Sequence, residues 1–130
     1  MPDLPTIREK PLTEAQEQER LLAVLRRHGV LYFAVPNGGR RGVREAVALR
    51  RQGVQSGIPD LVLPGPDARW RCLAIELKRT SGGRVSDEQA AWHRLLRSCG
   101  WQVLVCRGAD DAIEQLRRLD VLPRDRLAPK

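Results

Sequence analysis

The chain has 130 residues, of which 42% are hydrophobic and 30% charged, and its formal net charge is +7. This length suits one domain with one hydrophobic core, and the balance excludes a disordered or membrane chain. No apolar run approaches the roughly 20 residues that span a bilayer. The first ten residues lack the apolar stretch of a signal peptide, so we expect a cytoplasmic protein.

The positive charge is carried almost entirely by arginine, because the only lysines are Lys10, Lys78 and Lys130. Residues 26–51 hold seven arginines and a single acid, Glu45. The planar guanidinium binds phosphate oxygens in pairs, which favours a polyanionic partner; a solvated basic surface is the alternative. Aromatic residues make up only 4%, which argues against a platform on which single-stranded bases stack.

The three cysteines are Cys72, Cys99 and Cys106, and no two of them form a CxxC motif. Their odd number argues against a disulfide framework, and the distance between the two histidines argues against structural zinc. We expect all three cysteines to act as small core hydrophobes.

The first half of the chain predicts two helices and one strand. Residues 1–12 form an irregular lead-in with three prolines, after which Thr13 caps a helix over 14–27 that ends at Gly29. The apolar run 31–35 predicts a strand, and residues 36–39 predict a turn or loop. Apolar residues at helical spacing predict a second helix over 43–52.

The second half predicts a hairpin, a helix, a strand and a last helix. Strands over 60–63 and 70–78 flank a predicted turn at 64–67. Ser86 and Gln89 form a capping box for a helix that ends near Ser98, and a strand over 101–106 follows. Asp110 or Asp111 is expected to cap the last helix, which ends before Pro123. This order predicts one mixed α/β domain over residues 13–122, followed by a basic tail over 123–130.

The strand that ends at Lys78 carries a pattern with chemical meaning. Because side chains alternate between the faces of a strand, Leu73, Ile75 and Leu77 share an apolar face that should meet the core. Glu76 and Lys78 share the opposite face with Ala74, which places a carboxylate beside an ammonium group. A Glu-x-Lys pair alone is more often part of a solvated strand face.

Asp60 begins the preceding strand of the same hairpin. If the two strands pair antiparallel, Asp60 falls near the end where Glu76 and Lys78 lie. Two carboxylates at such a short distance repel each other unless a cation lies between them. Oxygen ligands favour Mg²⁺ or Mn²⁺. Such an ion with a neighbouring lysine suits phosphodiester hydrolysis. We therefore predict Asp60, Glu76 and the Leu77 carbonyl as metal ligands, and Lys78 as the group that orients water or stabilises charge.

These residues also resemble a known family. Gly57-Ile58-Pro59-Asp60-Leu61 followed by Ile75-Glu76-Leu77-Lys78 resembles the PD-(D/E)xK nuclease superfamily and, within it, the VRR-NUC family of virus-type replication–repair nucleases. The resemblance covers roughly residues 13–112. Gly53 to Gly57 also matches the family, and would shape the backbone that leads into the strand.

The resemblance implies further site residues. A glutamate at the start of the first helix would help to hold the metal and its water. Glu14 matches the family's position for this glutamate better than Glu17 does. Glu17 lies on nearly the same helix face and remains the alternative. Ser86 and Gln89 match a serine and a glutamine near the family's active site. There Gln89 would contact a phosphate or a water molecule, and Ser86 would contact DNA. Alternatively, both residues serve only the capping box.

The segment Pro36-Asn37-Gly38-Gly39-Arg40 is similar to a motif of phage-encoded members. By this resemblance Asn37, Arg40, Arg41 and Arg44 would contact the DNA backbone. A plain flexible turn is an equal alternative for Arg40.

The resemblance implies a restriction-endonuclease-like core, with a central mixed four-stranded sheet flanked by helices. It implies a Mg²⁺- or Mn²⁺-dependent DNA endonuclease, phage-encoded or phage-derived, that acts as a homodimer on branched, flapped or Holliday-junction DNA. The location would be the cytoplasm of a bacterial host or a phage-infected cell. Two alternatives are a nuclease for plain duplex DNA or RNA, and a nucleic-acid-binding module that has lost catalysis.

Overall fold

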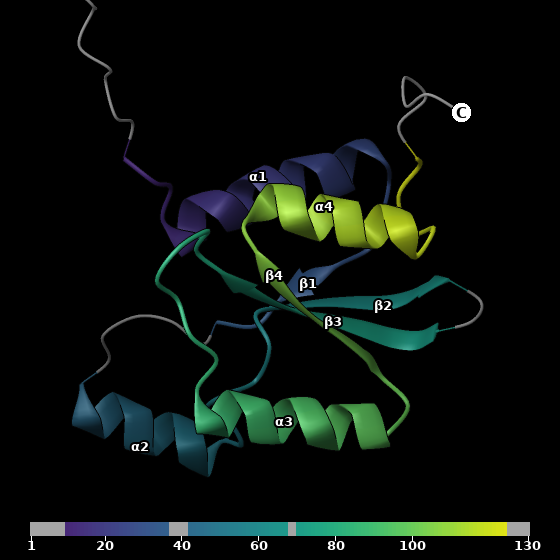
Figure 1. The fold of residues 1–130 in the computed structure, drawn as a ribbon. Coiled ribbons are helices and arrows are strands. Elements are labelled where there is room, and N and C mark those ends of the chain that lie inside the picture. The colour runs from purple at the N-terminus through teal and green to yellow at the C-terminus, as the bar shows by residue number, and fades with distance from the viewer. Residues whose placement is uncertain (1–9, 37–41, 68–69, 125–130) are drawn as a thin grey trace, which may run out of the picture.

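A computed structural model of the protein describes residues 10–36, 42–67 and 70–124. Its elements follow the predicted order of helices and strands (Figure 1). They are α1 (Glu14–Arg27), β1 (Phe33–Ala34), α2 (Val43–Arg51), β2 (Leu61–Asp67), β3 (Trp70–Lys78), α3 (Asp87–Ser98), β4 (Gln102–Arg107) and α4 (Ala109–Arg118).

The four strands form one mixed sheet in the order β1-β2-β3-β4. β1 and β3 both run antiparallel to β2, whereas β4 runs parallel to β3 after the crossover through α3. Leu61 pairs with Ile75 in the β2–β3 ladder. This register places Asp60, one residue before Leu61, level with Glu76.

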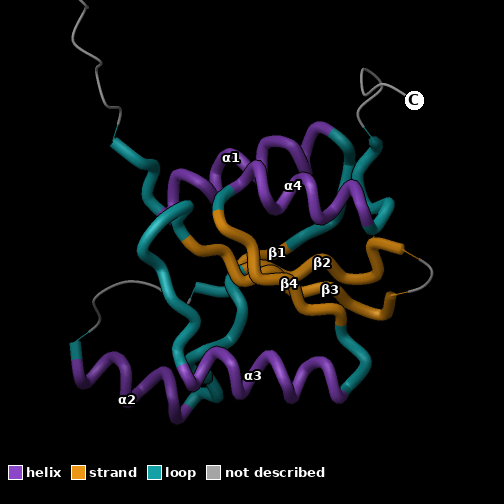
Figure 2. The backbone as a smooth tube through the Cα atoms, in the orientation of Figure 1, coloured by secondary structure: helices purple, strands orange, loops and turns teal. Residues whose placement is uncertain are grey.

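Helices cover both faces of the sheet, so the molecule has three layers (Figures 1 and 2). α1 and α4 lie together on one face, and α3 lies on the other; α2 is on the α3 side of the sheet. The predicted apolar face of β3 packs under α1 and α4, where Leu73, Ile75 and Leu77 join Leu21 and Leu25 in the core. Covering both faces buries every residue of β3 from Leu73 to Lys78, including its charged pair.

Side-chain caps fix where two helices begin. Thr13 Oγ1 accepts from the Gln16 amide at 3.1 Å, and Gln16 returns a bond to the Thr13 amide at 2.9 Å. Ser86 and Gln89 form the same reciprocal pair at the start of α3, as predicted. Each pair satisfies two amides that a helix start leaves without partners.

Some expectations about local structure are wrong. β2 continues through residues 64–67, where a turn was expected; Pro64 pairs with Cys72, Asp67 pairs with Trp70, and the register shifts between them. Gly108, rather than an aspartate, occupies the N-cap of α4, and Asp111 instead accepts from the Arg107 amide at 2.7 Å. β1 is only two residues long.

The cysteines divide between environments. Cys106 is buried as expected, Cys72 is partly buried, and Cys99 is exposed just after α3, so the prediction of a core role is wrong for Cys99. None of the helices in the described ranges combines the length and apolarity needed to cross a membrane.

Glu17 joins α1 to the junction between β4 and α4. Its side chain is buried, and Oε1 accepts from the Ala109 amide at 3.2 Å and from Arg20 at the same distance. A carboxylate at a helix start is stabilised by the helix dipole. The neighbouring Gly108 has φ +90°, and its amide donates to the Lys78 carbonyl at 2.8 Å. This junction therefore fixes the end of β3 from the α1 and α4 side of the sheet.

We predict that Gly108→Ala destabilises the protein more than Gly100→Ala. Both glycines have a positive φ near 90°, but an added Cβ at Gly108 would lie 2.8 Å from both Glu17 Oε2 and Thr80 Cγ2, whereas Gly100 faces open space. Each substitution should cost about 1 kcal/mol or more for the backbone alone. Urea denaturation should show a larger loss for Gly108→Ala, and equal losses would contradict the close packing.

Candidate active site

Asp60 is held by main-chain contacts at the end of the β2–β3 hairpin. Pro59 before it is buried, and the Asp60 carbonyl accepts from the Val35 amide at 2.9 Å. Its side-chain Oδ2 accepts from the Leu77 amide at 2.8 Å, which fixes the carboxylate against the end of β3. The loop before Pro59 is anchored too, because Ser56 hydrogen-bonds Glu88 at the start of α3.

Glu76 meets Asp60 across the two strands. The side chains share a hydrogen bond, although Glu76 is only 1% exposed. Burial, then the hydrogen bond and negative charge of Asp60, raise the pKa of Glu76 to about 9; Lys78 opposes this shift and Glu14 adds to it. Without a cation, Glu76 therefore keeps a proton at neutral pH.

Lys78 lies on the same face of β3 as Glu76 and reaches α3. Its Nζ donates to Gln89 Oε1 at 2.9 Å, the oxygen that also caps the Ser86 amide. Gln89 thus serves the capping box, which the sequence predicted, and also holds the lysine, a contact that the sequence did not predict. The Ser86 hydroxyl accepts from the Gln89 amide at 3.1 Å.

The two glutamates of the first turn of α1 have different surroundings. Glu14 is exposed, its charge acts on Glu76, and its Oε1 lies beside Gly83, as does the Lys78 side chain. Glu17 is buried at the start of α4 instead. Of the two, Glu14 is the one that faces the pair of carboxyl groups.

His93 is a contact that the sequence interpretation missed. Its Nε2 lies 3.2 Å from Glu76 Oε1, and the two side chains are 4% and 1% exposed. Burial, and then the charges of Arg97 and Lys78, lower the pKa of His93, so the ring is neutral at pH 7. The sequence held a signal for this contact, because His93 lies four residues after Gln89 and so shares its helix face.

The predicted DNA-contacting residues are only partly within the described chain. Asn37, Arg40 and Arg41 lie outside the described residues. Arg44 lies in the first turn of α2, where it is exposed, and none of the residues of α2 is buried.

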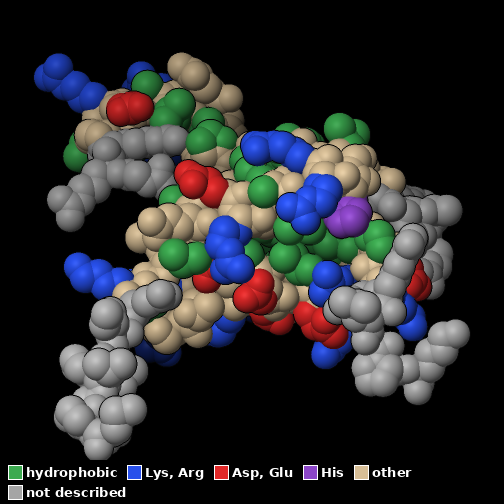
Figure 3. Space-filling view, turned by 90° about the horizontal axis from the view of Figure 1, so that it is seen from above, with side chains coloured by type: hydrophobic (Ala, Val, Ile, Leu, Met, Phe, Trp, Pro, Cys, Tyr) green, Lys and Arg blue, Asp and Glu red, His purple; other side chains and the backbone are tan. Residues whose placement is uncertain are grey.

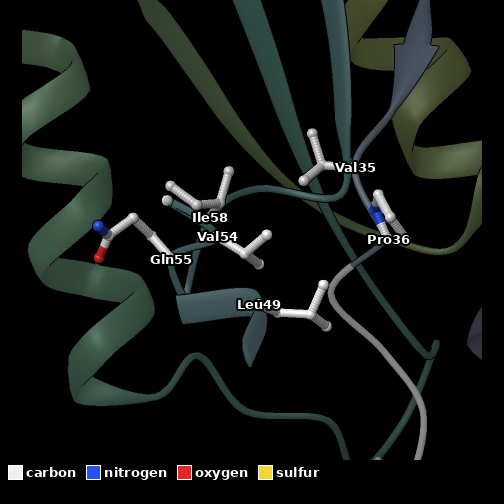
Figure 4. Close-up of a pocket in the computed structure, with 7 residues that line it drawn as sticks. Val35, Pro36, Leu49, Val54, Gln55 and Ile58 are labelled. Atoms are coloured by element: carbon white, nitrogen blue, oxygen red, sulfur yellow. The ribbon is translucent and has the colours of Figure 1, made fainter. Parts of the chain in front are cut away.

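A pocket of about 260 Å³ lies between α2 and the end of β1 (Figure 4). Its walls are mostly apolar and include Val35, Leu49, Val54 and Ile58. Among the described residues, those that line this pocket carry no acidic or basic side chain.

The donor set suits some metals and not others. Within residues 10–36, 42–67 and 70–124, no group of three or more His, Cys, Asp and Glu side chains could hold an ion by itself. Mg²⁺ is commonly bound through only one or two carboxylates, with water and substrate oxygens completing the octahedron. Asp60 and Glu76 fit that pattern, because a cation between them would replace the proton that now relieves their repulsion.

Comparison with known proteins agrees with this architecture. The model of the VRR-NUC domain matches residues 36–110, which is more than half of the chain. This chain belongs to the VRR-NUC family. A solved structure described as a VRR_NUC domain protein superposes with a TM-score of 0.70 over 85% of this chain and 89% of that one, at 24% sequence identity. It shares the fold. No curated protein matches the chain.

VRR-NUC membership gives the chain a nuclease-type fold, as the sequence predicted. The matched residues 36–110 contain Asp60, Glu76, Lys78 and Gln89, whereas Glu14 lies before the matched region.

We predict that the ion-free VRR-NUC protein loses stability as the pH rises from 7 to 9. The pKa of Glu76 is higher in the folded chain, about 9, than its ordinary value of 4.5, so the folded state binds the extra proton. Stability therefore falls through this window as folding becomes costly for the ionised form. Thermal melts in EDTA should show a Tm that falls as the pH rises. Added Mg²⁺ should raise the Tm more at pH 8.5 than at pH 7.

Glu76→Gln is the control for this prediction, since glutamine keeps the size of the side chain and cannot ionise. Its Tm should depend less on pH over the same range and respond less to Mg²⁺. An unchanged pH slope in this variant would show that the slope arises elsewhere.

Proposed function

We propose that this VRR-NUC protein is a Mg²⁺- or Mn²⁺-dependent endonuclease that hydrolyses phosphodiester bonds in DNA. The observation that carries the proposal is the meeting of Asp60 and Glu76 across β2 and β3, with Lys78 on the same face. Burying Glu76 against the half-buried carboxyl group of Asp60 costs free energy in a metal-free protein, and it becomes favourable once a cation is bound.

The carboxylates of Asp60 and Glu76 would be the principal metal ligands. The Leu77 carbonyl would be a third, because the N–H and C=O of one strand residue point towards the same neighbouring strand. The Leu77 amide donates to Asp60, so its carbonyl is on the Asp60 side of β3. Glu14, which is exposed at the start of α1, would act through a water molecule.

A divalent ion bound there would polarise a phosphoryl oxygen and lower the pKa of water. The chain supplies the other requirements. Lys78, held by Gln89, presents a positive charge that can orient the attacking water or stabilise the charge that develops on phosphate. Gln89 would also contact a phosphate or a water through its amide group. Because Glu76 and Lys78 are almost fully buried, their positions are fixed before substrate arrives.

Arginines near the α2 end of the molecule would hold the DNA backbone. Arg44 is exposed on α2, and we assign the same role to Asn37, Arg40 and Arg41, with Ser86 at the start of α3 as a further contact. In contrast, acidic and basic side chains are interspersed over the face formed by α1 and α4 (Figure 3). That face is a poorer match to a uniformly negative backbone.

We propose branched, flapped or junction DNA as the substrate and a homodimer as the active form, from the resemblance to short VRR-NUC members. Exposed apolar side chains support association between copies, since Phe33 on β1 is 52% exposed and Val43 on α2 is 81% exposed. Two-fold symmetry would match paired cuts in a branched substrate. Light scattering at the assay concentration tests the dimer, and a panel of labelled substrates tests the selectivity.

We predict that Asp60→Asn and Glu76→Gln each lower kcat for DNA cleavage by about 10²-fold or more, the scale at which losing a preorganised charged group acts. DNA binding in EDTA should persist in both variants, because the arginines that contact phosphate are unchanged. Glu114→Gln, at an exposed ion pair on α4, is the control and should cleave like the parent chain. Tight DNA binding by the parent without cleavage in Mg²⁺ or Mn²⁺ would instead favour a binding module.

We predict that glutamine substitutions separate the two glutamates of α1. Glu14→Gln should slow cleavage with little change in the urea midpoint, since its side chain is exposed beside the site. Glu17→Gln should lower the midpoint, because the buried carboxylate holds Ala109 and Arg20. The reverse pattern would assign Glu17 to the site and contradict the geometry.

A further inference from the structure

α3 and β3 meet through two side-chain contacts that have matching spacing. Two residues along a strand advance about 6.6 Å, and four residues along a helix advance about 6 Å. Glu76 and Lys78 therefore have nearly the same spacing as His93 and Gln89. The two contacts repeat at this spacing: Gln89 Oε1 accepts from Lys78 Nζ at 2.9 Å, and His93 Nε2 lies 3.2 Å from Glu76 Oε1.

The contact between His93 and Glu76 is sealed from solvent. His93 is the buried residue of α3, and its exposed side-chain fraction is 4%. A buried imidazole needs a hydrogen-bond partner, and the Glu76 carboxyl is the partner that the structure provides. Because the contact uses Oε1 of Glu76, the carboxyl group cannot rotate without breaking it.

We infer that His93 is a positioning residue, which donates Nε2–H to Glu76 Oε1 and so holds this carboxylate in the orientation that binds the divalent ion beside Asp60. This inference rests on the proposed function of the site. His93 does not touch the substrate, and Gln89 one turn earlier holds Lys78 in the same way. One face of α3 thus sets the geometry of both Glu76 and Lys78.

The physical reason is the entropy that a freely rotating carboxylate ligand loses when it binds an ion. A carboxylate with one oxygen fixed by an N–H donor has one oxygen left for the ion and little rotational freedom to lose when the ion binds. The same bond fixes the tautomer of the ring, with the hydrogen on Nε2. Losing such a support commonly weakens metal affinity or activity by about 10- to 100-fold.

Two substitutions at one position test the inference. In His93→Gln the side-chain amide can place an N–H near the position of Nε2, whereas His93→Leu fills the space without a donor. Mn²⁺ binding, measured by calorimetry without DNA, should weaken at least tenfold in His93→Leu and less than about threefold in His93→Gln. Cleavage should require correspondingly more Mn²⁺ in His93→Leu, while the KM for DNA at saturating Mn²⁺ stays unchanged. Arg94→Ala, at an exposed position of α3, is the control.

Equal losses of Mn²⁺ affinity in the two His93 variants, or none in His93→Leu, would overturn the positioning role. If the wild-type protein binds Mn²⁺ through Asp60 and Glu76 and His93→Leu binds it equally well, the proposed nuclease function would remain intact. A wild-type protein that neither binds Mn²⁺ nor cleaves DNA would overturn both.

A measurement on the unmodified protein covers the case in which His93→Leu does not fold. The ¹⁵N shifts of the His93 ring should report the hydrogen on Nε2 once Mg²⁺ is bound, and the ring signals should move on Mg²⁺ addition in the wild type but not in Glu76→Gln. Shifts that show the hydrogen on Nδ1 in the Mg²⁺-bound protein would overturn the inference.

Discussion

Asp60 contacts the buried Glu76 across two strands, and the register of β2 against β3 makes that contact unavoidable. Leu61 pairs with Ile75, so the next residues outward, Asp60 and Glu76, fall level with each other. A slip of one residue would turn Glu76 into the apolar layer under α1 and α4. The apolar residues of β3 and the two carboxyl groups are therefore fixed by the same pairing, and the core cannot form without bringing the acids together.

The surrounding layers hold this arrangement from both sides. α3 contacts the charged face of β3 through Gln89 and His93, whereas the junction of Glu17 with α4 fixes the carbonyl end of the strand from the opposite face. Buried polar groups of this kind are stable only when each has a partner, and here the partners come from segments far apart in the chain. The two glutamates in the first turn of α1 differ in the same way. Glu17 is buried and stabilises the fold, while Glu14 remains exposed near the carboxyl groups.

Much of the fold could be predicted because its signals are local. Thr13 and Ser86 mark helix starts through capping boxes, and the alternation in β3 correctly separates Leu73, Ile75 and Leu77 from Glu76 and Lys78. The failures arise where contacts with other segments override these local signals. Pro64-Gly65-Pro66-Asp67 has the composition of a turn, yet the pairing of Pro64 with Cys72 extends β2 through it, because cross-strand partners override local preference. An aspartate cap was expected for α4, but the helix begins earlier, at Ala109, directly after Gly108, whose positive φ suits glycine.

Spacing along the chain was enough to predict the order of elements, the family pattern, and Asp60, Glu76 and Lys78 as candidate site residues. Which helix glutamate faces the acids, and the contacts of Gln89 with Lys78 and of His93 with Glu76, are seen only in the folded chain. Each of these depends on how one layer is placed over another. Glu14 and Glu17 lie on nearly the same helix face, and only the position of α4 against α1 separates their environments. Packing of that kind is set by the whole core, which spacing within a single segment does not encode.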